Sequence, residues 1–179
     1  VVYTRMLNNP LYTAKLIGKI DDIDVGYLMG YDQSTPYIIP TKYGSDFIQT
    51  DLRSFGNALR LKKSLKGSSF IGFIGTDHET GDSYNRVAGF DGSFNFDEKY
   101  YFNWEALGYF TKEMNDTSIY DNSVKINSKG NDAGFNGEKL TGFGGTFSLV
   151  RSSRHWNGEI FMNIAPPEAR RELEKKKKN

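Results

Sequence analysis

Apolar and polar residues alternate along much of the chain, most regularly at residues 86–97 (RVAGFDGSFNFD). Successive side chains of an extended chain point to opposite sides, so a period of two predicts strands with one apolar and one polar face. Helical periodicity is nearly absent before residue 166, so we expect an all-β fold. Segments with this period, bounded by Gly, Asp, Asn and Ser, predict eight strands at residues 11–20, 24–32, 55–65, 68–77, 84–97, 99–111, 138–151 and 155–164.

The connections between these strands alternate in length. Those after the first, third, fifth and seventh strands are short, whereas the others are longer and occupy residues 33–54, 78–83 and 112–137. Because consecutive antiparallel strands reverse direction, all the longer loops emerge at one end, as they do in outer-membrane barrels. We therefore expect an antiparallel up-and-down meander of about eight strands that forms a β-barrel, or a barrel segment, over residues 1–165.

This topology also predicts where the chain ends lie. The first strand begins, and the last strand ends, on the side of the longer loops, whereas complete barrels of this class begin and end on the opposite side. The arrangement favours a piece of a larger barrel. Residues 166–179, which include RRELEKKKK, are predicted to be a basic C-terminal tail.

Large aromatic residues lie near the ends of several apolar faces, with small residues between them. On one strand Phe102, Trp104, Ala106, Gly108 and Phe110 share a side. A lipid-facing surface favours aromatic girdles at its two interfaces, whereas a protein core usually has its bulk at the centre. We therefore expect one face of the sheet to contact lipid and to carry Phe90, Phe94, Phe102, Trp104, Phe110 and Trp156.

The same alternation also fits a half-buried antiparallel sheet in a soluble protein. In that case the chain is a soluble eight-stranded barrel whose apolar side encloses a small hydrophobic ligand. Dependence of the fold on detergent distinguishes the two hypotheses.

Charged residues on the polar side are predicted to line a lumen. The first and third strands carry cations there, and the fifth, sixth and eighth carry anions. Cations and anions would then occupy different sectors of the wall and orient polar solutes, or they would neutralise one another. The predicted lumen residues are Lys15, Lys19, Arg60, Lys62, Asp91, Glu105 and Glu159.

Reactive groups are scarce. The chain has no Cys and two His, and its 23 basic residues nearly balance its 22 acidic residues, so nothing in its charge indicates a nucleic-acid partner. No nucleophile elbow or P-loop occurs. We therefore predict no enzymatic activity and no cofactor, and consider a hydrolase acting through Asp91 and Glu105 the weakest alternative. Residues 77–82 (DHETGD) offer metal-binding side chains but match no ligand spacing, so they are predicted to form a solvated turn rather than a metal site.

The two longest loops, residues 33–54 and 112–137, are expected to lie together on one rim. They combine aromatic residues with Asn, Asp and Ser, a mixture suited to stacking on sugar rings and to hydrogen bonding with hydroxyl groups. The predicted ligand-binding residues are Tyr37, Tyr43, Phe47, Tyr120 and Phe135.

Residues 57–96 (NALRLKKSLKGSSFIGFIGTDHETGDSYNRVAGFDGSFNF) resemble the repeating segment of an uncharacterised bacterial family. Members of that family carry a family-9-type carbohydrate-binding module ahead of a C-terminal outer-membrane barrel region. VVYTRML at the start and NIAPPEARRELE after the last strand are similar to the flanking segments of that family.

The resemblance implies a porin-like barrel with transmembrane β-strands in the bacterial outer membrane and no established reaction. We therefore expect a non-enzymatic outer-membrane barrel, or a fragment of one, for passage, binding or anchorage of polar solutes such as glycans. The expected partners are the lipid bilayer, polar small molecules or glycans, and other subunits or missing parts of the same barrel.

Overall fold

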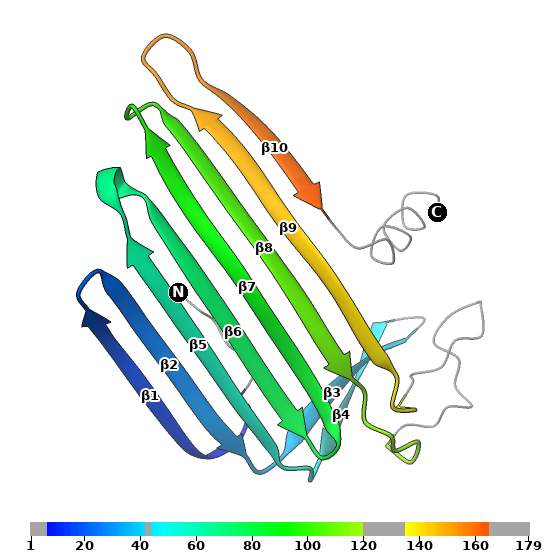
Figure 1. Cartoon of the computed structure of the whole chain (residues 1–179). Helices are drawn as coiled ribbons and strands as arrows, with labels where there is room; N and C mark the ends of the chain where they lie inside the picture. The colour runs from blue at the N-terminus through cyan, green and yellow to red at the C-terminus, as the bar shows by residue number, and fades with distance from the viewer. Residues whose placement is uncertain (1–6, 42–43, 120–134, 165–179) are drawn as a thin grey trace, which may run out of the picture.

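The structure, a computed structural model, describes residues 7–41, 44–119 and 135–164. Eight strands form one antiparallel sheet in the order β1-β2-β5-β6-β7-β8-β9-β10 (Figure 1). A short 3-10 turn, η1 (Lys66–Ser68), lies between β5 and β6. The strands of the sheet are β1 (Pro10–Ile20), β2 (Ile23–Asp32), β5 (Ser54–Ser64), β6 (Phe70–Thr80), β7 (Ser83–Phe96), β8 (Tyr100–Lys112), β9 (Lys139–Arg151) and β10 (Gly158–Ile164).

The predicted all-β fold and its antiparallel meander are confirmed. All eight predicted strands are present, with ends no more than three residues from those expected. Each strand pairs with the next one along the chain, apart from the hairpin inserted between β2 and β5. The predicted tail at 166–179 lies outside the described residues.

Three predicted connections were wrong. The segment 33–54 contains a separate hairpin, β3 (Thr35–Thr41) and β4 (Gly44–Thr50). The segment 78–83 is not a loop, because the β6–β7 ladder continues to the pair Thr80–Ser83 and leaves a two-residue turn at Gly81 and Asp82. The last strand starts at Gly158, so β9 and β10 are joined by residues 152–157.

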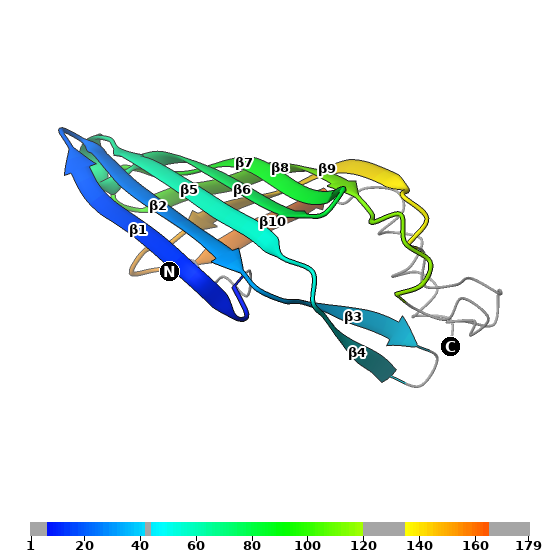
Figure 2. The same ribbon diagram turned by 90° about the horizontal axis from the view of Figure 1, so that it is seen from below.

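The sheet is open in the part of the chain that the structure describes. Its edge strands are β1 and β10, and no ladder joins them there. Figure 2 shows that the sheet is arched, with β1 and β10 below the middle strands, and that the β3–β4 hairpin leaves it on the concave side. The predicted meander is therefore present as a curved wall without closure.

The sheet has almost no core. Among the described residues, the buried hydrophobic side chains are Ala58, Met114 and Phe135. Large apolar side chains are instead exposed, including Leu16 at 63%, Phe143 at 66% and Ile160 at 70%. A globular domain normally buries such side chains between two packed layers. Within the described residues, this sheet therefore has no second layer that would bury these side chains.

No helix in the described ranges has the length and apolar character needed to cross a membrane.

Candidate functional site

The ladder register assigns one face of the sheet as apolar, because directly opposed residues of antiparallel strands project to the same side. Leu61 is opposite Phe73, Phe73 is opposite Phe90, Phe90 is opposite Ala106, and Ala106 is opposite Gly145. We call the side that these residues share the apolar face. Its large exposed side chains include Tyr12, Leu16, Ile20, Phe90, Phe96, Phe110, Phe143, Ile160 and Met162.

Charged residues of the apolar face are confined to the ends of the strands. Each lies among the first four or last four residues of its strand, so the middle of the face is an uninterrupted apolar band. On β8 this band runs from Phe102 through Ala106 to Phe110, with the small residue near its centre. The charged residues of this face are Lys63, Asp77, Glu79, Arg86, Lys112, Lys139 and Arg151.

Five of the six predicted aromatic residues lie on this face, and several aromatic rings of the face pack in pairs. The rings of Tyr12 and Tyr31 stack with centroids 5.3 Å apart, and those of Phe73 and Phe90 are 5.2 Å apart. The register also places Phe94, Phe102, Trp104 and Phe110 on the apolar face.

Trp156 was predicted within the last strand but lies in the connection before β10. Its ring contacts Arg151 of the apolar face, with the guanidinium carbon 3.8 Å from the ring centroid. The carbonyl oxygen of Trp156 accepts a hydrogen bond from the Ser153 hydroxyl, 2.7 Å away. Trp156 is therefore outside the β9–β10 ladder, but its indole lies next to the end of β9, at the edge of the apolar face.

The opposite side, which we call the polar face, carries all seven predicted lumen residues. One row across it consists of Lys62, Gly72, Asp91, Glu105 and Thr146, each opposite the next. By the same register the face also carries Lys15, Lys19, Arg60 and Glu159.

The polar face is on the concave side of the arch. Tyr37 of β3 lies beside the hydroxyls of Thr80 and Ser83, which belong to the polar face, and Figure 2 shows its hairpin on the concave side. Side chains from β5 and β7 also meet on this face across the intervening strand β6, as Arg60 and Asp91 do. The apolar face is therefore convex.

Part of the charge on the polar face is neutralised. Arg60 binds Asp91 through both guanidinium nitrogens, and the Nη2–Oδ2 distance is 2.7 Å. Glu105 is directly opposite Asp91 and adds to the negative potential around Arg60. The pair crosses β6 above Gly72, whose lack of a side chain leaves room for it.

The other charged residues predicted to line the lumen differ in sign from one side of the sheet to the other. Lys15 and Lys62 are on the β1–β5 side, where Lys19 also contacts Asp24 at 3.8 Å. Glu159 is on β10 and accepts a hydrogen bond from the Ser148 hydroxyl, 2.9 Å away. The polar face thus combines the predicted separation of charge into sectors with the predicted neutralisation.

The two long segments lie together on one rim, as predicted. Tyr37 of the first segment and Phe135 of the second pack edge to face, with ring centroids 5.4 Å apart. Phe135 and Met114 form a small buried cluster, and the partly buried Tyr37, Ile48, Leu52 and Ile119 pack against it.

This packing changes the interpretation of the predicted ligand-binding aromatics. Phe135 is only 7% exposed, so its ring is not free to stack on a sugar, and this part of the prediction was wrong. Burial raises the pKa of the Tyr37 phenol above its ordinary value of 10.0. Phe47 is 63% exposed and remains available for contacts. Tyr43 and Tyr120 lie outside the described residues.

The rim also contains a hollow that sequence reasoning did not find. It has a volume of about 480 Å³ and lies between β3, the turn between β6 and β7, and the end of β8. Its walls combine hydroxyl and amide groups with apolar side chains. The sequence did not predict the hollow, because one of its walls is β3, and the segment 33–54 that contains β3 was expected to be a loop. Six of the residues that line it are Tyr37, His78, Thr80, Ser83, Asn85 and Phe135.

Residues 77–82 do not converge on one point. Asp77 and Glu79 are on the apolar face and bind Arg86, with an Asp77 Oδ1–Arg86 Nε distance of 3.0 Å. His78 projects to the polar face. Asp82 accepts a hydrogen bond from Lys112 Nζ at 3.0 Å, which lowers the pKa of its carboxyl below 3.8. Strand alternation thus separates the side chains that a metal ion would need together.

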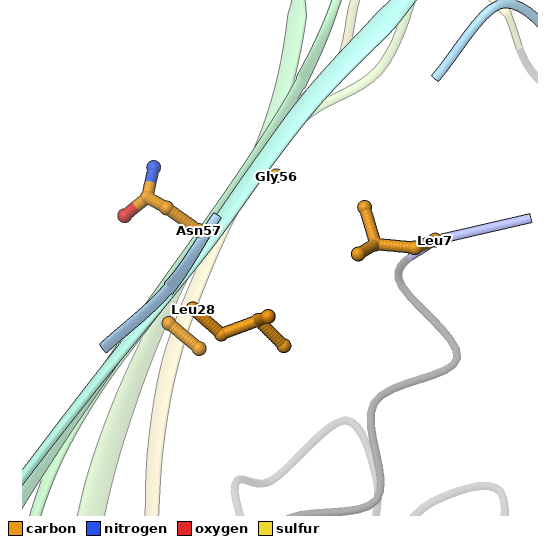
Figure 3. A pocket seen from close by; sticks show the side chains of 5 residues that line it. Leu7, Leu28, Gly56 and Asn57 are labelled. Atoms are coloured by element: carbon orange, nitrogen blue, oxygen red, sulfur yellow. The ribbon is translucent and has the colours of Figure 1, made fainter. Parts of the chain in front are cut away.

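The segment before β1 folds back over the polar face. Leu7 packs against the sheet beside Leu28 and Gly56, whereas Asn57 points away on the other side (Figure 3). The Asn8 amide donates a 2.7 Å hydrogen bond to the buried carboxylate of Asp32. This segment therefore covers part of the polar face next to β2 and β5.

Comparison of the chain with protein-family models, with curated protein sequences and with solved structures found no significant match.

Proposed function

We propose that this chain forms part of the wall of a non-enzymatic β-barrel in a bacterial outer membrane. The observation that carries the proposal is the apolar face, which extends over all eight strands of the sheet and has exposed large apolar side chains on every strand except β5. A contiguous apolar surface of this extent needs a partner, because water does not solvate it favourably. A lipid bilayer would suit this face, because its acyl chains would contact the apolar band and its head groups would contact the charged strand ends.

The dimensions support a bilayer as that partner. β8 contains 13 residues, which extend about 43 Å at 3.3 Å per residue. At a tilt near 45° such a strand covers about 30 Å, which is the thickness of the hydrocarbon core. Aromatic residues toward both ends of the β8 band suit the two interfaces.

The curvature supports a polar lumen. The concave side carries Lys15, Arg60, Asp91, Glu105 and Glu159, as expected if the wall encloses water. We therefore propose that the polar face contacts solutes that pass, bind or are anchored at the cell surface. A soluble barrel with a hydrophobic ligand would need the apolar face on the inside, which this curvature does not favour.

The edge strands support completion by further strands. β1 and β10 run in opposite directions, because each strand of the sheet is antiparallel to its neighbours. The β1 edge of one wall can therefore pair antiparallel with a β10 edge. Other subunits, or further strands of the same barrel, would supply the pairing that closes the wall and removes its open edges.

The test is folding into lipid vesicles, with two substitutions at the same level of the sheet. Ala106→Arg puts a charge in the middle of the apolar band, and Thr146→Arg puts it beside Glu105 on the polar face. We expect Ala106→Arg to lower the free energy of unfolding in the bilayer by about 2–4 kcal/mol and Thr146→Arg to change it little. Equal effects, or a wild-type chain that stays folded and monodisperse in detergent-free buffer, would contradict the proposal.

A further inference from the structure

We propose that the rim hollow binds an uncharged, polyhydroxylated ligand such as a short oligosaccharide. This inference rests on the proposed function, because it takes the rim to be reached by solutes from outside the membrane. The hollow is distinct from the charged middle of the polar face, and its described lining comes from β3, β6, β7, the end of β8 and Phe135.

The shape of the hollow is suitable for a small ligand. Its volume of about 480 Å³ falls within the range of small-molecule sites. β3 forms one wall, β6 and β7 form the floor, and the end of β8 with Phe135 forms the other side. The Tyr37–Phe135 contact joins the walls, so the two long segments hold the hollow in place on the rigid sheet.

The chemistry of the lining favours a neutral polar ligand. Hydroxyl and amide groups come from Thr35, Thr80, Ser83, Asn85 and Thr111. Among the described residues of the lining, Lys112 and Glu113 carry opposite formal charges, and Lys112 also binds Asp82. These charges do not select an anion, whereas several neutral groups of the lining can exchange hydrogen bonds with ligand hydroxyls.

An exposed apolar side chain completes the match. Ile38 lines the same hollow and is 67% exposed. Sugars combine hydroxyl groups with apolar C–H surfaces, so a site that places both kinds of side chain around one space suits them better than it suits an ion or a purely apolar molecule.

Several hydroxyl groups of the lining lie together. Tyr37, Thr80 and Ser83 all line the hollow, and the phenol of Tyr37 lies beside the hydroxyls of Thr80 and Ser83. Each hydroxyl can both donate and accept hydrogen bonds. Ligand hydroxyls in the hollow would exchange hydrogen bonds with this group.

The experiment measures binding of maltotetraose, cellotetraose and chitotetraose to the full chain in lipid vesicles by isothermal titration calorimetry. The variants are Thr80→Val, which keeps the side-chain shape, and Asn85→Ala. The matched control is Thr146→Val, on the polar face in the middle of β9. We expect at least one of these sugars to bind, with affinity about tenfold weaker in each hollow variant and unchanged in the control.

Vesicle insertion of each variant is measured in parallel. A wild-type chain that inserts but binds none of the three sugars at millimolar concentration overturns the inference and leaves the proposed function intact. Binding that is equally strong in wild type, Thr80→Val and Asn85→Ala also overturns it. A chain that fails to insert overturns the proposed function instead.

Discussion

Arg60 and Asp91 meet across a strand to which neither belongs. Arg60 is on β5 and Asp91 on β7, and their side chains pair above Gly72 of β6, with 29% and 24% of the two side chains exposed. A Cβ atom at Gly72 would lie 2.6 Å from Asp91 Oδ1 and 2.7 Å from Arg60 Nη2. The glycine therefore makes this long-range ion pair possible.

Gly72→Ala is expected to displace the pair. The loss of a partly exposed bidentate ion pair lowers the free energy of unfolding by about 1 kcal/mol, measured by denaturant titration in vesicles. Gly18→Ala is the matched control, because a Cβ atom there meets nothing within 4 Å. In an Asp91→Asn background the Gly72→Ala effect should shrink. If Gly72→Ala and Gly18→Ala are equally costly, the space above Gly72 has no role in the pairing.

Leu7 offers a test of the segment that folds over the polar face. A Cβ atom at Gly30 would overlap the Leu7 side chain, so Gly30→Ala should push this segment off the sheet. We expect hydrogen exchange at the Asn8 amide, which binds Asp32, to accelerate about tenfold while the ladder amides of β5 stay protected. Unchanged exchange at Asn8 would show that Leu7 does not hold the segment in place.

Lys112 and Asp82 predict a pH dependence at the rim. The hydrogen bond from Lys112 lowers the pKa of Asp82 below its ordinary value of 3.8. The stabilisation is therefore fully present above pH 3.8 and is lost as the pH falls through the lowered value.

Lys112→Met is expected to reduce the thermal stability of the rim at neutral pH and to lose this effect in strong acid. Asp82→Asn serves as the control, because it removes the titrating carboxyl. Its stability should also be below that of the wild type at neutral pH and equal to it in strong acid. A Lys112→Met effect of constant size at every pH would mean that Lys112 acts by packing of its alkyl chain and not through its charge.

Phe135 is expected to hold the two long segments together. Phe135→Ala removes the contact with Tyr37 and opens the buried cluster with Met114, at a cost of up to about 3 kcal/mol in local opening. The measurement is hydrogen exchange at the Glu113 amide, which donates to the Glu138 carbonyl at 2.8 Å. Phe47→Ala, at an exposed residue of the hairpin, should leave this amide unchanged. Equal protection in wild type and Phe135→Ala would contradict a stabilising role.

The sequence predicted most of the sheet because its signal is local. The period of two assigns Phe90 and Asp91 to opposite faces, and the register bears this out. The hairpin β3–β4 was missed because Pro36 and Pro40 lack the N–H donors that strands use, and they interrupt the alternation. The turn at Gly81 and Asp82 was misplaced because charged residues at the end of β6 resemble a loop.

The candidate site was less predictable than the sheet. The positions of Lys62 and Glu105 on the polar face follow from the alternation of side chains along each strand. The Arg60–Asp91 pairing depends in addition on the register between three strands. The burial of Phe135 depends on the packing of one long segment against another. Neither leaves a pattern in the nearby sequence.

The most direct test of the lipid-facing wall is a fluorescence scan of β8 in vesicles. The chain has no cysteine, so single cysteines can be introduced without removing others and labelled with an environment-sensitive dye. Lipids with a quencher on their acyl chains are expected to quench the dye in Trp104→Cys, Ala106→Cys and Gly108→Cys.

The same lipids should leave the dye unquenched in Asn103→Cys, Glu105→Cys and Leu107→Cys. Leu107 makes the scan decisive, because it is apolar yet lies on the polar face. Quenching that alternates with a period of two and spares Leu107→Cys is the predicted result. Quenching without alternation, or quenching of the polar-face series alone, would contradict the account.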